Sequence, residues 1–255
     1  NAEHIGYFRF IGKVIARALI QRQCVNAHFT RSFCRQILHQ QVKLKDFEDI
    51  NENIYKSMKS ILDDDVEPLC LNFTIDEDEL GVTKTILLKE NGDEIDVNNE
   101  NKKEYVSLYT NYRLRKSIID QVTAFCEGFN FLIPHEEIRM FSPSELDLLI
   151  CGIPNIDVND LMMHTSYSYP YNKDHPVVQM FFKVISNWSN EYLGKFLLFL
   201  TGSSQMPVIG FKYYCDIGKP ITLSHVSDKE RLCVAHTCFN TLDLPEYDSE
   251  EIMNR

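Results

Sequence analysis

Cys238 lies near the C-terminal end of the sequence, in a setting suited to nucleophilic chemistry. It follows the short apolar run 232–235 and comes two residues after His236, while Pro245 ends any regular element soon afterwards. A thiol where a strand runs into a loop can be reached by a reactant, whereas a thiol on a helix face is usually packed. Such a cysteine suits exchange with a thioester, because the attacking and leaving groups are both thiols.

The residues around Cys238 leave several roles open. His236 can act as a general base, but an orienting or packed histidine fits the sequence equally well. Thr237 and Asn240 can hydrogen-bond a reacting carbonyl or hold the loop. The predicted support of the active loop consists of His236, Thr237, Phe239 and Asn240.

The other seven cysteines do not form a recognisable metal or disulfide framework. The sequence has no C-x-x-C pair and no His/Cys cluster with zinc spacing, so no metal site is predicted. Their scattered spacing favours a reducing compartment, the cytosol or the nucleus, with most thiols structural. These cysteines are Cys24, Cys34, Cys70, Cys126, Cys151, Cys215 and Cys233.

The composition is that of an ordinary globular protein. The 255 residues are 44% hydrophobic and 25% charged, which is enough for a substantial core and argues against disorder. A net charge of -11 argues against a general nucleic-acid binder. No apolar run is long enough to cross a bilayer, and no signal peptide opens the sequence.

Both ends of the sequence look cut. It starts without a methionine and enters a helical pattern at once, and the helix-start signal at 248–251 is followed by the last residue, Arg255. We therefore expect this sequence to be a fragment of a longer protein.

The elements that must position Cys238 fall into two parts. In the first, apolar periodicity predicts helices over 5–19, after Thr30, over 47–62 and over 105–125, and Ser142 to Glu145 form a capping box for a further helix. Alternation over 71–75 and 83–88 predicts a small β insertion, with a hairpin turn at Asn91-Gly92. The segment 152–155 is the best candidate linker.

The second part is predicted to be a compact α+β unit. Helices are expected over 176–188 and 191–200, ending at Gly202. Short strands are expected over 207–211, 213–217, 221–226 and 232–237. The predicted fold class is therefore α+β with two lobes: a mostly helical N-lobe with a small β-containing subdomain, and an α+β C-lobe that carries the cysteine.

Several segments together resemble one known family. The segment 236–240 followed by 244–247 resembles the active-cysteine signature of HECT-type ubiquitin ligases. Further blocks of the same domain are matched, in the family's order, by 8–14, 99–105, 148–152 and 199–204. The resemblance implies an N-lobe at 1–151, an interlobe hinge at 152–155 and a catalytic C-lobe at 156–255.

The resemblance also implies a reaction. A ubiquitin-conjugating enzyme (E2) would dock on the N-lobe and pass ubiquitin to Cys238 as a thioester, which a lysine of a protein substrate would then attack. No cofactor is implied, because the thioester arrives activated. The expected hinge residues are Gly152, Ile153, Pro154 and Asn155.

The E2 would bind a subdomain at roughly 57–125. Aromatic residues and methionine at helical spacing are by themselves more typical of a core, but the resemblance assigns several of them to the E2 groove. The predicted E2-binding residues are Met58, Ile61, Leu62, Lys103, Tyr105 and Tyr109.

The sequence departs from the family in two ways. Cys233 stands where the family usually has proline, which predicts a less rigid strand before the active loop. The family's domain also begins before Asn1 and continues past Arg255 through a helix and a catalytic tail, so the fragment alone is expected to be weakly active or inactive.

Two other functions compete with the ligase. One is a cysteine hydrolase that uses Cys238 with His236, against which stands the lack of another recognisable base or oxyanion motif. The other is a catalytically silent module that binds E2 or ubiquitin, against which stands the intact active-cysteine segment.

Overall fold

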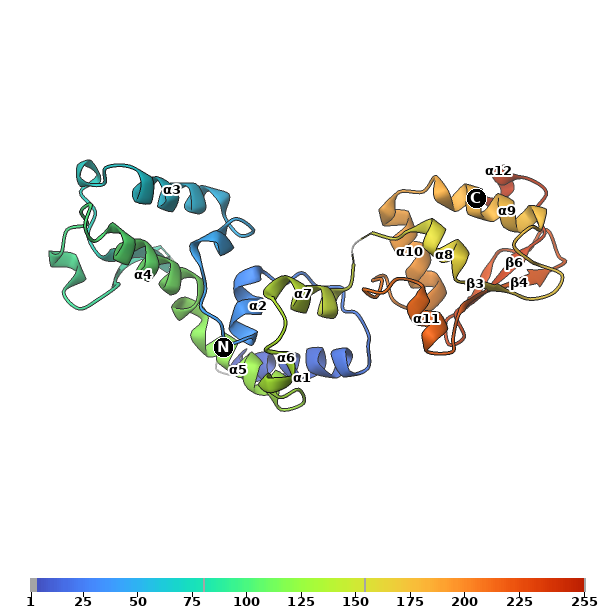
Figure 1. The fold of residues 1–255 in the computed structure, drawn as a ribbon, viewed down its shortest axis with the longest axis horizontal. Coiled ribbons are helices and arrows are strands. Elements are labelled where there is room, and N and C mark those ends of the chain that lie inside the picture. Colours follow the sequence, from blue (N-terminus) through green and yellow to red (C-terminus); the bar gives the residue numbers. More distant parts are fainter. Residues whose placement is uncertain (1–3, 80, 154, 255) are drawn as a thin grey trace. The chain divides into compact units, whose positions relative to one another are not determined.

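A computed structural model describes residues 4–79, 81–153 and 155–254, with mixed helices and small sheets (Figure 1). The chain divides into two compact units. The first comprises residues 1–17 and 28–147, and the second comprises residues 18–27 and 148–255. The predicted α+β class is confirmed.

The helices α1 (His4–Ile20) and α5 (Ile119–Asn130) cross at unusually close range in the first unit. A Cβ atom on Gly12 would lie 2.1 Å from the carbonyl oxygen of Phe125, and one on Gly128 would lie 2.0 Å from that of Arg9. Only glycine allows this backbone approach. An ion pair between Arg9 and Glu127, at 2.6 Å, lies beside the crossing.

Three further helices complete this part of the molecule: α2 (Arg31–Ile37), α6 (His135–Ile138) and α7 (Pro143–Cys151), the last of which crosses the boundary between the units. The Thr30 hydroxyl accepts the Phe33 N–H and caps α2 as predicted. The capping box is also confirmed, because the Ser142 N–H donates to Glu145 Oε2 at 2.7 Å and the Glu145 N–H donates to Ser142 Oγ at 3.3 Å.

A second core in the first unit joins α3 (Glu52–Asp63), α4 (Lys102–Leu114) and a hairpin of β1 (Thr74–Glu79) and β2 (Val82–Leu87). Its buried members are Met58, Ile61, Val66, Phe73, Ile75, Leu88, Val97, Tyr105 and Val106. Short 3-10 turns link these elements at Leu44–Phe47, Glu67–Leu69, Gly92–Glu94 and Lys116–Ile118.

The β insertion exists, but its predicted turn is wrong. The antiparallel pairing runs from Thr74↔Leu87 to Glu79↔Val82, so the hairpin closes before Val82 rather than at Asn91. Asn91 does adopt the left-handed conformation, with φ 54°, but it starts the 3-10 turn that follows the hairpin. A turn-forming dipeptide fixes the local backbone and not the strands that pair.

The second unit is built on a four-stranded sheet in the order β3-β4-β6-β5. The strands β3 (Thr165–Tyr167), β4 (Ile221–Val226) and β6 (Thr241–Pro245) are parallel, and β5 (Val234–His236) pairs antiparallel with β6. The strand that carries the cysteine turn is therefore an edge strand of this sheet.

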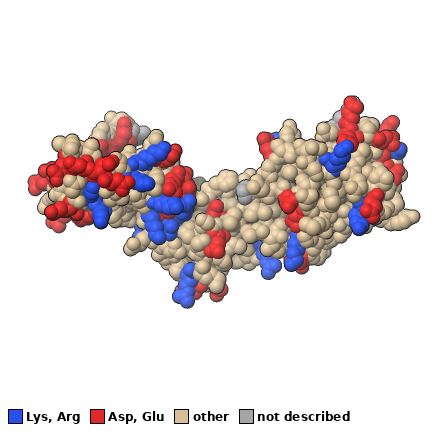
Figure 2. All heavy atoms as spheres, turned by 45° about the horizontal axis from the view of Figure 1, so that its top comes forward, with Lys and Arg blue, Asp and Glu red and all other residues tan. Residues whose placement is uncertain are grey.

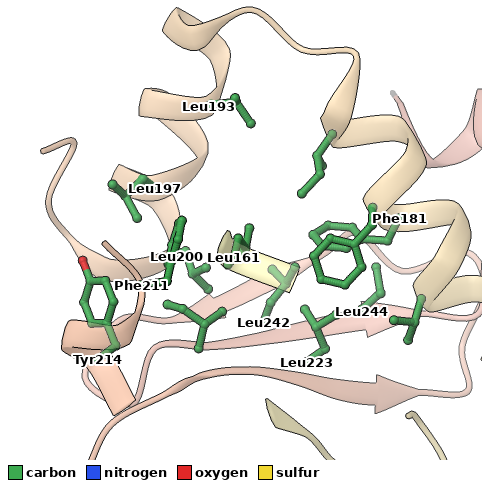
Figure 3. Packing of buried hydrophobic residues seen from close by; sticks show 14 of the residues in the cluster. Leu161, Phe181, Leu193, Leu197, Leu200, Phe211, Tyr214, Leu223, Leu242 and Leu244 are labelled. Carbon is green, nitrogen blue, oxygen red and sulfur yellow. The ribbon is translucent and has the colours of Figure 1, made fainter. Parts of the chain in front are cut away.

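The helices of the second unit cover this sheet with a leucine- and phenylalanine-rich core. Leu193, Leu197, Leu200 and Phe181 from the helices and Leu242 from the sheet belong to one buried cluster (Figure 3). The helices are α8 (Val158–Met163), α9 (Pro176–Ser186), α10 (Asn190–Thr201), α11 (Lys212–Asp216) and α12 (Glu250–Met253).

Two of the predicted strands are wrong. Residues 207–211 form turns and 213–217 fall largely within α11, where Tyr213 and Tyr214 are buried together on one short helix. Two strands, β3 and β6, were not predicted. The helices predicted over 176–188 and 191–200 are confirmed, and Gly202, with φ 80°, ends α10 as expected. In the first unit the helix predicted over 105–125 is instead two helices, α4 and α5, separated by the 3-10 turn Lys116–Ile118, and the helix predicted over 47–62 begins only at Glu52.

On the face drawn in Figure 2, acidic and basic side chains lie among one another. Within the described part of the chain, no helix combines the length and the apolar character that crossing a membrane requires.

Candidate active site

Cys238 lies on the turn that connects β5 with β6. His236 and Thr241 are the last paired residues of this antiparallel hairpin, and residues 237–240 form the turn between them. The thiol is exposed, and the ring of the next residue, Phe239, is 72% exposed. The predicted placement of the cysteine, at a strand end in a loop, is confirmed.

Asn240 anchors this turn to the rest of the sheet. It is only 6% exposed and has a left-handed backbone, with φ 49°, which asparagine tolerates better than most residues. Its Nδ2 donates to the carbonyl oxygen of Lys219 at 2.8 Å, and its own carbonyl accepts the Thr222 N–H at 3.0 Å. Asn240 therefore holds the turn, one of the two roles left open by the sequence.

His236 is hydrogen-bonded to a carboxylate. Its Nε2 lies 3.1 Å from Oδ2 of Asp243, a residue that also lies 3.8 Å from the Arg231 guanidinium. Among the hydrogen bonds of the described residues, none joins His236 to the Cys238 thiol. The bond to Asp243 fixes the orientation of the imidazole. The geometry therefore favours an orienting role for His236 over that of a general base already in contact with the thiol.

Two further contacts complete the turn. The Phe239 N–H donates to the His236 carbonyl at 3.0 Å, and the Asn240 N–H reaches the Thr237 carbonyl at 3.5 Å. The Lys219 ammonium lies 3.5 Å from the carbonyl oxygen of Cys238 itself. Lys219 and Asp243 were not predicted, because neither belongs to a motif. The pairing of β4 with β6 brings Lys219 to the turn, and the pairing of β5 with β6 brings Asp243 to His236.

A small hollow of about 170 Å³ lies beside the cysteine within the second unit. Its lining includes hydroxyl and amide side chains together with the Lys219 ammonium. It is smaller than the roughly 300–1,000 Å³ of typical small-molecule sites. Among its lining residues are Thr201, Ser203, Gln205, Lys219, Thr237 and Cys238.

Cys233 is not a second nucleophile of this site. It is half-buried, and its sulfur lies 3.8 Å from the hydroxyl of Tyr247, which also donates to the Arg231 carbonyl at 2.8 Å. Burial raises the pKa of the Cys233 thiol and, together with Cys233, raises that of Tyr247 to about 12. A protonated thiol that packs against Tyr247 is a structural group.

The remaining cysteines separate by exposure. Cys70 and Cys215 are exposed, whereas Cys34 and Cys151 are buried. Burial raises the pKa of Cys126 to about 11, which leaves it a thiol at neutral pH.

The structure divides the predicted E2-binding residues into two groups. Met58, Ile61 and Tyr105 are at most 7% exposed and lie in the core shared by α3, α4 and the hairpin. Leu62 and Tyr109 are half-buried at the edge of that core, and Lys103 is exposed. Any direct contact with a partner through this set therefore involves Leu62, Lys103 and Tyr109.

At the predicted hinge, Gly152 has φ 77°, and a Cβ there would lie 2.4 Å from the Met206 carbonyl oxygen. The Ile153 N–H donates to that same oxygen at 2.8 Å. Pro154 lies outside the described residues. The assignment of a hinge to Gly152, Ile153, Pro154 and Asn155 stays a prediction.

Comparison with known proteins agrees with the cysteine signature. The model of the HECT-domain (ubiquitin-transferase) family matches residues 1–255. The chain belongs to this family.

Several named relatives align over nearly the whole chain. E3 ubiquitin-protein ligase pub1 of Schizosaccharomyces pombe is 42% identical over 98% of this chain and 33% of its own length. E3 ubiquitin-protein ligase RSP5 of Emericella nidulans is 40% identical over 99% of this chain and 31% of its own length. The chain thus spans about a third of the length of these relatives.

Proposed function

We propose that this chain is the transfer module of an E3 ubiquitin ligase, which accepts ubiquitin from an E2 as a thioester on Cys238 and passes it to a lysine of a protein substrate. The observation that carries the proposal is the exposed thiol at the tip of an anchored hairpin, in a chain of the HECT family. The free thiols fit action in the cytosol or the nucleus.

The chemistry of the turn supports a covalent carrier. The exposed Cys238 thiol can attack the E2 thioester, and its sulfur leaves again when an amine attacks, so neither step needs a metal ion or an organic cofactor. Asn240 and the β5–β6 pairing hold the nucleophile in one backbone geometry while its side chain stays accessible. The Asp243–His236 pair is the candidate group for steering the incoming amine.

Delivery of ubiquitin is assigned to the first unit. In this proposal the E2 docks on the subdomain at roughly 57–125, where Leu62, Lys103 and Tyr109 offer the accessible part of the predicted groove. The segment 152–155 then lets the catalytic lobe carry Cys238 between donor and acceptor.

The test is thioester formation. The full-length parent that contains this chain is incubated with activating enzyme, E2, ATP and ubiquitin, and the products are separated without and with reductant. We expect an adduct that reductant removes, that is absent in Cys238→Ala and that becomes reductant-resistant in Cys238→Ser, because an oxyester replaces the thioester.

The matched control is Cys215→Ala, which removes another exposed thiol of the same unit and should leave the adduct intact. An adduct that survives Cys238→Ala would refute the proposal. Hydrolysis of ubiquitin conjugates by the chain would instead favour the cysteine hydrolase, and E2 binding without any adduct would favour the silent module.

A further inference from the structure

A groove of about 340 Å³ follows one face of α5 in the first unit. Its lining residues on this helix recur at positions 119, 122–123, 126–127 and 130, which is the spacing of a single helix face. From the first of them to the last, α5 rises about 16 Å. That length matches about five residues of an extended chain. The groove is therefore elongated.

The second wall of the groove comes from the end of α2 and the residues just after it. Gln36, His39 and Gln40 line this side. Gln36 is only 6% exposed, and its Nε2 donates to the carbonyl oxygen of Leu114 at 2.9 Å. The His39 ring stacks on that of His135 at 4.0 Å. Both walls are therefore anchored, and the groove is preformed.

Two side-chain amides of the groove carry an oxygen that has no hydrogen-bond partner. They are Oε1 of Gln36 and Oδ1 of Asn130, and both atoms are buried. The Gln36 amide cannot be turned around to solve this, because its Nε2 already donates to the carbonyls of Ser32 and Leu114. A buried acceptor without a donor destabilises the fold. A ligand that brings N–H groups to these oxygens would remove that cost.

An extended peptide offers such N–H groups along its length, together with carbonyl acceptors. Side-chain amides match a peptide backbone well, because each amide has both a donor and an acceptor. Gln40 supplies the donor side: its Oε1 accepts the Arg35 guanidinium at 3.2 Å, and the hydrogen bonds of the described residues leave its Nε2 open to a peptide carbonyl. Thr123 adds an exposed hydroxyl.

The charges of the lining give the groove a polarity. Arg115, just before α5, is exposed, and within the described part of the chain no carboxylate pairs with it. Glu127, in the last turn of α5, is already paired with Arg9 at 2.6 Å. Burial and the neighbouring His135 lower the pKa of His39, which is therefore neutral at pH 7. The positive charge that remains lies at the end where α5 begins.

We propose that this groove binds an extended peptide segment of about five residues whose acidic end lies at Arg115. Peptide N–H groups meet the oxygens of Gln36 and Asn130, and a peptide carboxylate meets the guanidinium, which can hold it through two parallel hydrogen bonds. The groove belongs to the first unit and Cys238 to the second, so this inference does not rest on the proposed function.

The experiment measures peptide binding to the full-length parent that contains this chain, by calorimetric titration at millimolar peptide. Because the direction of the bound chain is open, the probes are acetyl-Ala-Leu-Ala-Leu-Asp-amide and acetyl-Asp-Leu-Ala-Leu-Ala-amide. For each, one control replaces Asp by Asn and removes the charge, and another carries N-methylated Leu residues and lacks their N–H donors. Inorganic phosphate serves as a simple anion. Hydrogen exchange then locates the bound peptide.

We expect saturable binding of at least one acidic peptide, with protection of α2 and α5 from exchange. The Asn and the N-methylated versions should each bind about tenfold more weakly. In Arg115→Gln the preference for Asp over Asn should disappear. The matched control Lys116→Gln removes a neighbouring exposed cation that does not line the groove, and it should keep the preference.

Several results would overturn the inference. Absence of saturable binding by both acidic peptides is one, and equal binding of the Asp and Asn versions is another. A preference that survives Arg115→Gln places the carboxylate elsewhere, and an N-methylated peptide that binds undiminished removes the role of the amide oxygens. Phosphate that displaces the peptide while protecting the same helices equally well would reduce the groove to a site for simple anions.

Discussion

Asn240 shows how one side chain can fix the geometry of a reactive turn. Its left-handed backbone and its bond to the Lys219 carbonyl lie directly after the nucleophile and its exposed neighbour Phe239. The thiol can thus be exposed without the turn being loose.

Replacing Asn240 tests this role. Asn240→Ala removes a buried hydrogen bond and puts a Cβ-bearing residue without a capping side chain in the left-handed region, which should cost about 2–4 kcal/mol of stability in the second unit. Asn240→Gly loses the bond but accepts the backbone, and it should recover about 1 kcal/mol of that loss. Denaturant unfolding followed through Trp188, which lies in this unit, measures both; equal stabilities for Asn240→Ala and the unchanged chain would contradict the role.

At the scale of elements, the closest helix contact is the crossing of α1 and α5. Gly12 and Gly128 each face the backbone of the other helix, at distances that no Cβ atom could share. A side chain at either glycine would collide with backbone atoms of the other helix, and backbone atoms cannot move aside as the end of a flexible side chain can. The contact therefore tolerates little adjustment.

We therefore predict that Gly12→Ala destabilises the first unit by about 2–4 kcal/mol, as overpacking of a rigid contact does. Gly6 lies in the same helix with open space around it, and Gly6→Ala should be neutral or stabilise the helix by up to about 1 kcal/mol. Hydrogen exchange in α1 and α5 reports both variants. Similar exchange in the two would show that the crossing is not tight.

Helix ends that are marked by neighbouring residues in the sequence were predicted correctly. The caps at Thr30 and Ser142 and the glycine stop at Gly202 are local signals, and the structure confirms them. The periodicity over 105–125 did not reveal the break between α4 and α5 at the 3-10 turn Lys116–Ile118. Short elements were harder to predict. The helix α11 has five residues, too few for a helical period to be told from alternation, and its tyrosines were interpreted as a strand.

The candidate site was predictable only where its residues are neighbours in the sequence. Cys238 and its neighbours lie in one segment, whereas Lys219 and Asp243 reach the turn only through strand pairing. Tyr105 illustrates a conflict between two kinds of signal. Its helical spacing indicated a core, the resemblance assigned it to a partner surface, and the structure places it in the core at 5% exposure.

At the scale of the whole molecule, delivery and chemistry are assigned to different compact units. The predicted docking residues lie in the first unit, and Cys238 with its supporting residues lies in the second. The hinge predicted at 152–155 lies a few residues beyond the boundary between the units, within the second unit, and its role stays a prediction.

Tyr109→Ala should slow loading of Cys238 from the E2 about tenfold and leave loading from a mercaptoethanesulfonate thioester of ubiquitin unchanged, because the first reaction needs docking and the second does not. The ratio of the two rates is the measurement. Tyr169→Ala removes a tyrosine that is 97% exposed in the second unit and should change neither rate. Equal slowing of both reactions by Tyr109→Ala would point to a folding defect instead.

The small hollow beside Cys238 sets a limit on what this centre can discriminate. A space of about 170 Å³ has room for a single side chain, and it cannot register the sequence or shape of a folded acceptor. Under the proposed function, we therefore expect the turn around Cys238 not to distinguish one acceptor protein from another, and to react with any amine that stays close for long enough. Choice must then be exercised through residence time, by surfaces that hold one protein near the thiol for longer than another.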